Sequence, residues 1–137
     1  MPPVSGAMVV NVDGGARGNP GPAAIAAVAS DPTGEVLAER SELIGDATNN
    51  VAEYRAMLLG IQLATELGAD EVELIGDSEL IVKQVRGEYK VKQDHLRPLH
   101  TKVIDALRGL TQWTIRSVPR EQNLRADELV NEVLDSG

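Results

Sequence analysis

The order of strands and helices is decided first by residues 7–30, which read AMVVNVDGGARGNPGPAAIAAVAS. The β-branched run at 7–13 predicts a strand, and the glycine- and proline-rich segment at 14–22 predicts a loop. The small apolar residues at 23–30 predict a second strand. Two strands joined by one loop favour antiparallel pairing, so the fold starts with a hairpin.

Beyond this hairpin the sequence adds a third strand and then changes to helical periodicity. Residues 31–34 predict a turn, and residues 35–44 predict the strand that completes an antiparallel meander. Residues 50–67 place apolar side chains three and four positions apart, which is typical of an amphipathic helix that ends at Gly68.

The second half of the chain alternates further strands and helices. The predicted elements are a strand at 71–76, helices at 78–85 and 94–109, a strand at 113–118 and a helix at 124–135. The order βββαβααβα predicts an α/β fold with a five-stranded mixed sheet flanked by helices, in a single domain over residues 1–137. Because strand–helix–strand crossovers connect parallel strands, the first, fourth and fifth strands should be parallel.

The composition is that of a globular protein without thiol chemistry. Hydrophobic residues make up 42% of the chain and charged residues 25%, which is a globular balance. Because cysteine is absent, disulfides and thiolate sites are excluded, and any metal must be held by oxygen ligands or by His95 and His100. No apolar stretch approaches the roughly 20 residues that span a membrane, and the start lacks a signal peptide. We therefore expect a cytoplasmic protein with no membrane segment.

The charge of the chain is unevenly distributed. A net charge of −8 argues against a nucleic-acid partner at first sight. Residues 83–108, however, contain seven basic and three acidic side chains and carry a net charge of +4. An acidic chain with one basic segment suits a protein that needs divalent cations to approach phosphate.

Two acidic residues occupy the ends of predicted strands. Asp13 directly follows a β-branched run, and Asp77 follows the predicted strand at 71–76. In parallel sheets, ligands bind beyond the carboxyl ends of the strands. If the two strands are neighbours, these carboxylates lie close together.

Two more acidic residues lie on predicted helices. Glu53 is in the first turn of the helix at 50–67, and Asp127 has helical spacing to Val130 and Leu134, so it should point toward the sheet. Carboxylates gathered without cations repel one another, and their pKa values rise. Such a cluster needs hard cations, and oxygen ligands suit Mg²⁺ or Mn²⁺.

Each of these carboxylates also has a structural alternative, which stays open at this point. Glu53 stands at the spacing of a helix capping box, and Asp77 could cap the short helix after it. Asp13 could form a turn, and Asp127 could pair with Arg125 or another surface base. Together, these alternatives require four independent accidents at two strand ends and two helix flanks.

Four sequence blocks resemble type 1 ribonuclease H. They are residues 13–22 (DGGARGNPGP), 48–53 (TNNVAE), 76–78 (GDS) and 123–129 (NLRADEL). The resemblance covers nearly the whole chain in the family's order, and it is to the compact bacterial and archaeal subgroup without the basic protrusion. It implies a ribonuclease H-like fold and a metal-dependent endoribonuclease that hydrolyses the RNA strand of RNA–DNA hybrids.

The resemblance also implies the residues and the cofactor of this reaction. Asp13, Glu53, Asp77 and Asp127 match the family's catalytic carboxylates. In the family these hold two metal ions per active site with substrate, Mg²⁺ or Mn²⁺. Two-metal hydrolysis implies products with a 5′-phosphate and a 3′-hydroxyl. The expected partner is an RNA–DNA hybrid.

Further residues resemble the family's contacts to the hybrid. The contacts to RNA 2′-hydroxyls and minor-groove edges match Gly14, Gly15, Asn19, Asn49 and Asn50. The 2′-hydroxyl is the group that distinguishes RNA from DNA. Thr48 resembles a residue that holds a phosphate of the DNA strand. Helix capping is the open alternative for the two adjacent asparagines.

The sequence departs from the family in two places. The loop at 117–122 lacks the histidine that many relatives carry, and Arg120 either takes over beside the phosphate or is a surface residue. The segment at 86–92 is too short for the basic protrusion. Lys90 and Lys92 either grip the DNA strand more weakly or belong to a solvated loop. Both histidines of the chain match no metal position of the family, and we interpret them as structural.

Two other functions stay open beside the endoribonuclease. One is a non-catalytic module that binds hybrids or RNA, and the other is a different nuclease on the same fold. A monomer is expected. The end at residues 136–137 is compatible with a domain of a longer fused chain.

Overall fold

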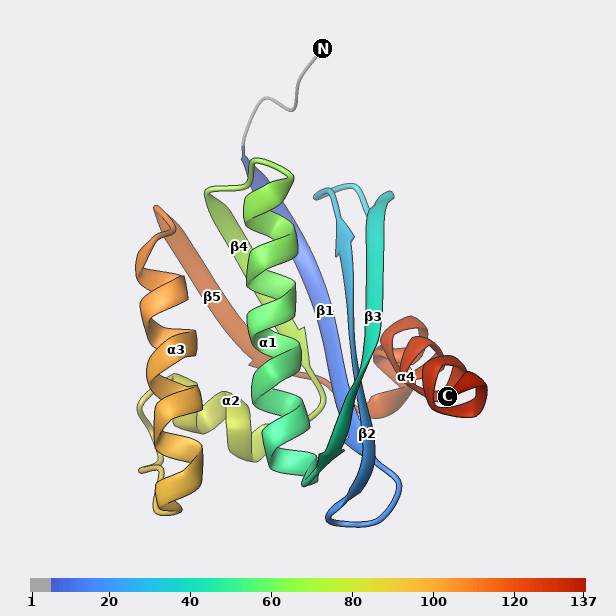
Figure 1. Ribbon diagram of the computed structural model, residues 1–137. Coiled ribbons are helices and arrows are strands. Elements are labelled where there is room, and N and C mark those ends of the chain that lie inside the picture. Colours follow the sequence, from blue (N-terminus) through green and yellow to red (C-terminus); the bar gives the residue numbers. More distant parts are fainter. Residues whose placement is uncertain (1–5) are drawn as a thin grey trace.

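The structure, a computed structural model, describes residues 6–137 as one five-stranded sheet with four α-helices (Figure 1). The strands are β1 (Ala7–Ala16), β2 (Gly21–Ser30), β3 (Val36–Ala47), β4 (Glu71–Gly76) and β5 (Gln112–Ser117). The helices are α1 (Asn49–Glu66), α2 (Glu79–Val85), α3 (Arg97–Arg108) and α4 (Leu124–Ser136), with short 3-10 turns η1 (Asp94–Leu96) and η2 (Arg120–Gln122). The predicted order βββαβααβα is confirmed. Among the helices of residues 6–137, none combines the length and the apolar character needed to cross a membrane.

The sheet has the strand order β3-β2-β1-β4-β5. β1, β2 and β3 form the predicted antiparallel meander, and β4 and β5 run parallel to β1 as the crossover argument predicted. The pairing of β1 with β4 ends where Asn11 meets Ile75. The two strands therefore separate just before Asp13 and Asp77.

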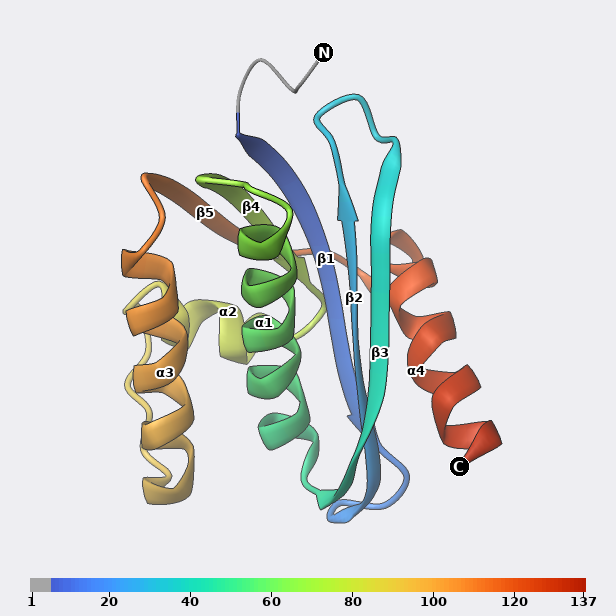
Figure 2. The same cartoon turned by 45° about the horizontal axis from the view of Figure 1, so that its top comes forward.

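Helices cover both faces of the sheet. α1 packs on β1 and β2 and contacts α3, whereas α4 packs on the opposite face over β2, with contacts to β1 and β3 (Figures 1 and 2). Side chains of β2 face α1 and α4 alternately, and every position from Ala23 to Ala29 is buried. The small residues of β2 thus let both helices lie close to the sheet.

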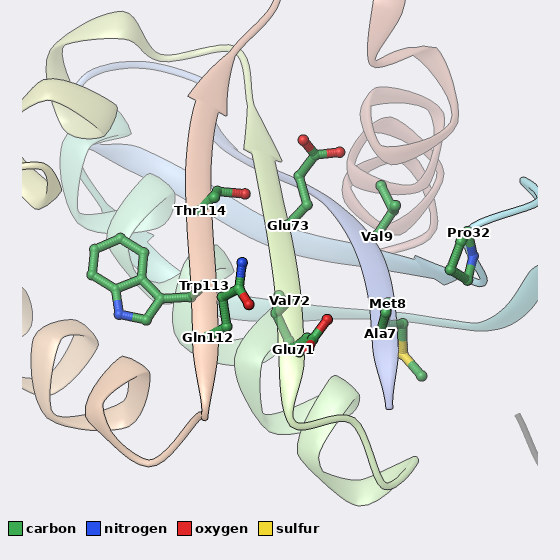
Figure 3. A pocket seen from close by; sticks show the side chains of 10 residues that line it. All are labelled: Ala7, Met8, Val9, Pro32, Glu71, Val72, Glu73, Gln112, Trp113 and Thr114. Atoms are coloured by element: carbon green, nitrogen blue, oxygen red, sulfur yellow. The ribbon is translucent and has the colours of Figure 1, made fainter. Parts of the chain in front are cut away.

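A shallow pocket of about 200 Å³ lies on the sheet near the beginnings of β1, β4 and β5. Figure 3 shows Val9, Glu73 and Thr114 side by side along its floor. The pocket lies toward the amino-terminal ends of these strands, whereas Asp13 and Asp77 lie at the carboxyl-terminal ends. It is therefore separate from the predicted site.

The first hairpin is tighter than the sequence predicted. The prediction of a loop over 14–22 is wrong at both ends, because β1 continues to Ala16 and β2 begins at Gly21. Gly14 serves packing rather than a turn, since a Cβ atom there would lie 2.3 Å from the carbonyl oxygen of Ala52 in α1. The glycine marks a close approach of α1 to β1, and this approach brings Glu53 to Asp13.

We expect Gly14→Ala to destabilise the protein by about 1–3 kcal/mol, because the added methyl group overlaps backbone atoms of Ala52 and Glu53. Gly15→Ala is a matched control, since the nearest atom to a Cβ there is a Val130 methyl carbon at 3.8 Å, an ordinary contact. Urea unfolding of both variants in EDTA measures the difference. Equal stabilities would contradict this account of Gly14.

Candidate active site

Three carboxylates from different elements meet where β1 and β4 separate. Asp13 comes from β1, Asp77 directly follows β4, and Glu53 lies near the start of α1. Each offers one oxygen atom, and these three oxygens all lie within 4.8 Å of one another. The backbone N–H of Gly14 donates a hydrogen bond to Glu53 Oε1 at 3.2 Å. The close approach of α1 to β1 therefore also orients the Glu53 carboxylate.

The cluster carries more negative charge than its surroundings compensate. Burial raises the pKa of Asp13 to about 7, and the carboxylates of Asp77 and Asp127 add to this rise. Burial, together with repulsion from Asp13 and Asp77, raises the pKa of Glu53 well above its usual value. Burial also raises the pKa of Asp77, although the Arg120 guanidinium opposes this rise. A cation bound among the carboxylates would relieve the repulsion.

The oxygen atoms of the cluster fit a hard divalent cation. Among residues 6–137, Glu53 Oε2 and Asp77 Oδ2 are the buried side-chain oxygens without a hydrogen-bond partner. Buried polar atoms without partners are costly in a folded protein, and a bound cation would satisfy both. Neither His95 nor His100 lines the pocket. An all-oxygen ligand set suits Mg²⁺ or Mn²⁺.

Asp127 lies at the rim of the cluster rather than inside it. It is half-buried near the start of α4 and lines the same pocket of about 400 Å³ as the three other carboxylates. Its charge contributes to the raised pKa of Asp13, but it is not one of the three residues with oxygens within 4.8 Å. The structure thus brings three of the predicted carboxylates together and places the fourth beside them.

The structural alternatives for the three clustered carboxylates are wrong. The side chain of Thr48 caps α1, so Glu53 takes no part in a capping box. The side chain of Ser78, rather than that of Asp77, caps α2. Asp13 is paired inside β1 and does not form a turn. The local backbone therefore does not account for these three side chains.

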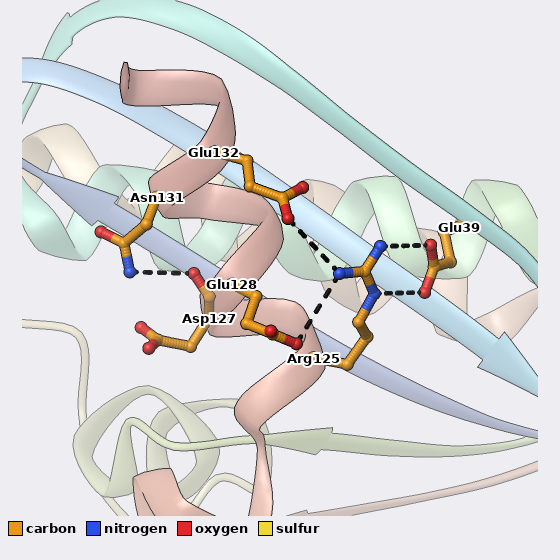
Figure 4. A network of polar contacts seen from close by, with 6 residues as sticks. All are labelled: Glu39, Arg125, Asp127, Glu128, Asn131 and Glu132. Carbon is orange, nitrogen blue, oxygen red and sulfur yellow. Dashed lines mark hydrogen bonds and ion pairs between the residues drawn. The ribbon is translucent and has the colours of Figure 1, made fainter. Parts of the chain in front are cut away.

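The alternative for Asp127, an ion pair with Arg125, is also wrong. The Nε and Nη2 atoms of Arg125 donate to the two carboxylate oxygens of Glu39 at 2.7 and 2.9 Å. Its Nη1 atom lies 3.6 Å from oxygens of both Glu128 and Glu132. Figure 4 shows the Asp127 carboxylate pointing away from this network. The network holds α4 on β3. Asp127 takes no part in it and lines the pocket instead.

The predicted substrate-binding residues fall into two groups. Those that line the pocket are Gly14, Gly15, Asn49, Asn50 and Arg120. Asn19 is not among the residues that line this pocket. Its Oδ1 accepts a hydrogen bond from the backbone N–H of Asn49 at 3.0 Å. Asn49 Oδ1 in turn accepts from the backbone N–H of Ala16 at 2.9 Å. These bonds tie the first hairpin to α1. The alternative that the side chain of Asn49 or Asn50 caps α1 is wrong, because the Thr48 side chain accepts from the backbone N–H of Val51.

Arg120 lies in η2 with an exposed side chain, and its Nε is 3.9 Å from Asp77 Oδ2. Sequence reasoning missed three other polar residues that line the pocket, Arg17, Ser78 and Asn131. Helical spacing could have identified Asn131, which follows Asp127 by one turn and donates a hydrogen bond to its backbone oxygen at 3.1 Å.

Another pocket, of about 520 Å³, adjoins the pocket that contains the carboxylates, because Asn50 lines both of these pockets. Its lining includes Tyr89, Lys90 and Lys92. The segment at 86–93 that carries them is a loop without a helix. The predicted absence of a helical basic protrusion is therefore confirmed for this segment.

Comparison with known proteins identifies relatives along almost the whole chain. A family model described as reverse transcriptase-like matches residues 11–133. Ribonuclease HI of Halobacterium salinarum is 44% identical over 123 residues, which make up 90% of this chain and 62% of that protein. The crystal structure of RNase H1 from this archaeon has a TM-score of 0.94 at 41% identity, covering 96% of this chain and 99% of that one.

Two further relatives extend this likeness. The bifunctional protein Rv2228c of Mycobacterium tuberculosis is 42% identical over 130 residues, or 94% of this chain and 36% of that protein. LC11-RNase H1, whose structure was solved with an RNA/DNA hybrid, has a TM-score of 0.89 at 44% identity, covering 94% of this chain and 97% of that one. The chain spans 62% and 36% of the two curated relatives that it matches. The family match and these likenesses show that the chain belongs to the type 1 ribonuclease H family.

Proposed function

We propose that this protein is an endoribonuclease that hydrolyses the RNA strand of RNA–DNA hybrids with divalent cations. The observation that carries the proposal is the buried cluster of Asp13, Glu53 and Asp77, whose pKa values are raised and in which two oxygens have no partner. The relative named ribonuclease HI and the hybrid complex of LC11-RNase H1 support the choice of substrate.

The carboxylates share the binding of the cations. Asp13, Glu53 and Asp77, whose oxygens lie together, would hold the central cation, and Asp127, which lines the same pocket, would contribute to a second site at the rim. Two ions bound there would supply an activated water and would stabilise the leaving oxygen, so that the products would carry 5′-phosphate and 3′-hydroxyl ends. The exposed guanidinium of Arg120, beside Asp77, is placed to contact the phosphate of the RNA strand.

Recognition of the hybrid falls to short polar groups around the pocket. The Asn50 amide lines both pockets and is free to meet a 2′-hydroxyl of the RNA. The glycine backbone at 14–15 lines the pocket that contains the carboxylates. Asn19 and Asn49 contribute by holding the first hairpin against α1. The Thr48 hydroxyl oxygen accepts a hydrogen bond from the backbone N–H of Val51 in α1. The hydroxyl hydrogen can therefore donate to a phosphate of the DNA strand.

The test is cleavage of end-labelled RNA annealed to DNA, in Mg²⁺ and separately in Mn²⁺, by the wild type and Asp77→Asn. We expect internal cuts in the RNA of the hybrid, and no cuts in EDTA or with Asp77→Asn. Asp105→Asn is the matched control, because this exposed carboxylate on α3 lines neither pocket, and it should cleave normally. Binding without cleavage in both metals would favour the non-catalytic module, and cleavage of duplex DNA would favour another nuclease.

Lys90 and Lys92 extend the proposed path of the hybrid past Asn50, and we expect them to contact phosphates of the DNA strand. The double variant Lys90→Ala/Lys92→Ala should reduce the slope of log affinity against log salt by about 2, because each lysine–phosphate contact contributes about 1. Its KM should rise while kcat stays unchanged. Lys102→Ala, exposed on α3 and outside both pockets, is the control. A wild-type salt slope in the double variant would contradict the contact.

A further inference from the structure

One buried polar side chain lies next to the cluster, where its hydrogen bond to Asp77 opposes the rise in the pKa of that carboxyl group. Asn123 directly precedes α4 and is only 2% exposed. Asparagine at this position usually caps the helix that follows, yet the Asn123 side chain makes no capping bond to α4. Its Nδ2 instead donates to the carbonyl oxygen of Val12 at 2.9 Å, and its Oδ1 accepts from Asn11 Nδ2 at 3.0 Å. Helix capping therefore does not explain this residue.

These bonds link the backbones that carry two of the carboxylates. Val12, whose carbonyl oxygen Asn123 holds, directly precedes Asp13. The backbone carbonyl oxygen of Asn123 accepts from the backbone N–H of Asp127 at 3.2 Å. A single residue thus bridges the strand of Asp13 and the first helical turn of Asp127.

The bridge lies where β1 and β4 separate. Their last paired residues are Asn11 and Ile75, so the Val12 carbonyl lies just beyond the ladder. A buried carbonyl needs a donor, and the Asn123 amide supplies it. The same connection between β5 and α4 also ties β4, because the backbone N–H of Val118 donates to the Gly76 carbonyl at 2.9 Å. One loop thus holds the residue before Asp13 and the residue before Asp77.

We propose that Asn123 is a positioning residue that fixes Asp127 relative to Asp13 and Asp77, and so completes the cation site at the rim of the pocket. This inference rests on the proposed function of the site. The hydrogen bonds of Asn123 set where α4 starts, whereas the Arg125–Glu39 pair holds α4 on β3 at the exposed side. Loss of the carboxamide leaves α4 attached but lets its first turn shift.

The test compares Asn123→Ala with Leu107→Ala, which removes a fully buried side chain of α3 outside both pockets. Calorimetric titration with Mn²⁺ and kinetics on the hybrid are measured well below the melting temperature of each variant. We expect Asn123→Ala to weaken cation binding and to lower kcat, each by about 10- to 100-fold, because outer partners of metal ligands have effects of this size. KM for the hybrid should stay within about twofold. Leu107→Ala should lose stability but keep cation affinity and kcat.

Asn11→Ala keeps the proposal testable if Asn123→Ala does not fold. It removes only the donor to Asn123 Oδ1, so a smaller loss of cation affinity in the same direction is expected. Wild-type cation affinity and kcat in the variant that folds would overturn the positioning role and leave the proposed function intact. Absence of hybrid cleavage by the wild type would overturn the proposed function, and the Mn²⁺ titrations would still decide the role of Asn123.

Discussion

Asp13→Asn is expected to abolish cleavage and, at the same time, to stabilise the metal-free protein. The activity should fall by more than about 10³-fold, because loss of an outer partner of a metal ligand alone lowers activity about 10- to 100-fold. Asp13 supplies one of the three oxygens that lie within 4.8 Å of one another. An amide at this position keeps the shape of the side chain but binds a divalent cation less well.

The stabilisation follows from the electrostatics of the cluster. Asp13 is buried, and its pKa is raised from 3.8 to about 7. Each increment of one in pKa corresponds to about 1.4 kcal/mol, so the ionised carboxylate costs on the order of 4 kcal/mol at pH 8. The asparagine variant lacks this cost. Thermal unfolding at pH 8 in EDTA should therefore give a higher Tm for Asp13→Asn than for the wild type.

Asp105→Asn is the control for this experiment, because it removes an exposed carboxylate of α3 and should leave both kcat and Tm nearly unchanged. A variant at Asp13 that loses activity and also loses stability would show that the carboxylate is needed for folding. That result would contradict the account of the cluster as a set of charges held together for a cation.

A second large effect is expected in the pH dependence of stability. A carboxyl group with a higher pKa in the folded than in the unfolded protein binds more protons when folded, so stability falls as pH rises. For Asp13 this fall extends from about pH 3.8 to about pH 7. Between pH 5 and pH 8 the metal-free protein should lose roughly 3 kcal/mol through Asp13 alone, or roughly 10 °C in Tm.

The exposed ion pairs act in a different pH range. Ion pairing with basic side chains lowers the pKa values of Glu39, Glu66 and Glu79 below 4.5. Their contribution is therefore lost only as pH falls below that value. Exposed pairs also contribute little to stability. The slope between pH 5 and pH 8 thus reports on the buried cluster.

Scanning calorimetry at pH 5 and pH 8, each with EDTA and with saturating Mg²⁺, measures this effect. Mg²⁺ should raise Tm more at pH 8 than at pH 5, because protons compete with the cation for the carboxylates at the lower pH. Asp13→Asn in EDTA should show a flatter pH profile than the wild type. A wild-type Tm in EDTA that rises between pH 5 and pH 8 would rule out the raised pKa values.

The sequence predicts the fold well where one interaction dominates each segment. The β-branched run of β1 and the helical spacing of α1 each match a single period, and the crossover rule then determines which strands are parallel. The hairpin was predicted less accurately because glycine serves two purposes. Gly14 and Gly15 read as turn residues, yet both lie in paired strand, and only the packing of α1 shows why a side chain is excluded at Gly14.

The candidate site shows the same division between local and long-range information. Strand ends indicated that Asp13 and Asp77 would be neighbours, and the structure brings them together with Glu53. The place of Asp127 at the rim depends on how α4 packs across the sheet, which no local pattern encodes. No role for Asn123 was predicted from the sequence, because a sequence shows neither its burial nor the strand that it contacts.

The alanine-rich strand β2 contributes no carboxylate, yet it separates the helix of Glu53 from the helix of Asp127. Ala26 and Ala27 are completely buried and face opposite helices, so a larger side chain at either position must push a helix outward. The side chains of β2 thus set the spacing between the two helices that carry carboxylates of the proposed cation site. The proposed cation site would therefore restrict which side chains β2 can carry, in addition to the usual need for a close-packed interior.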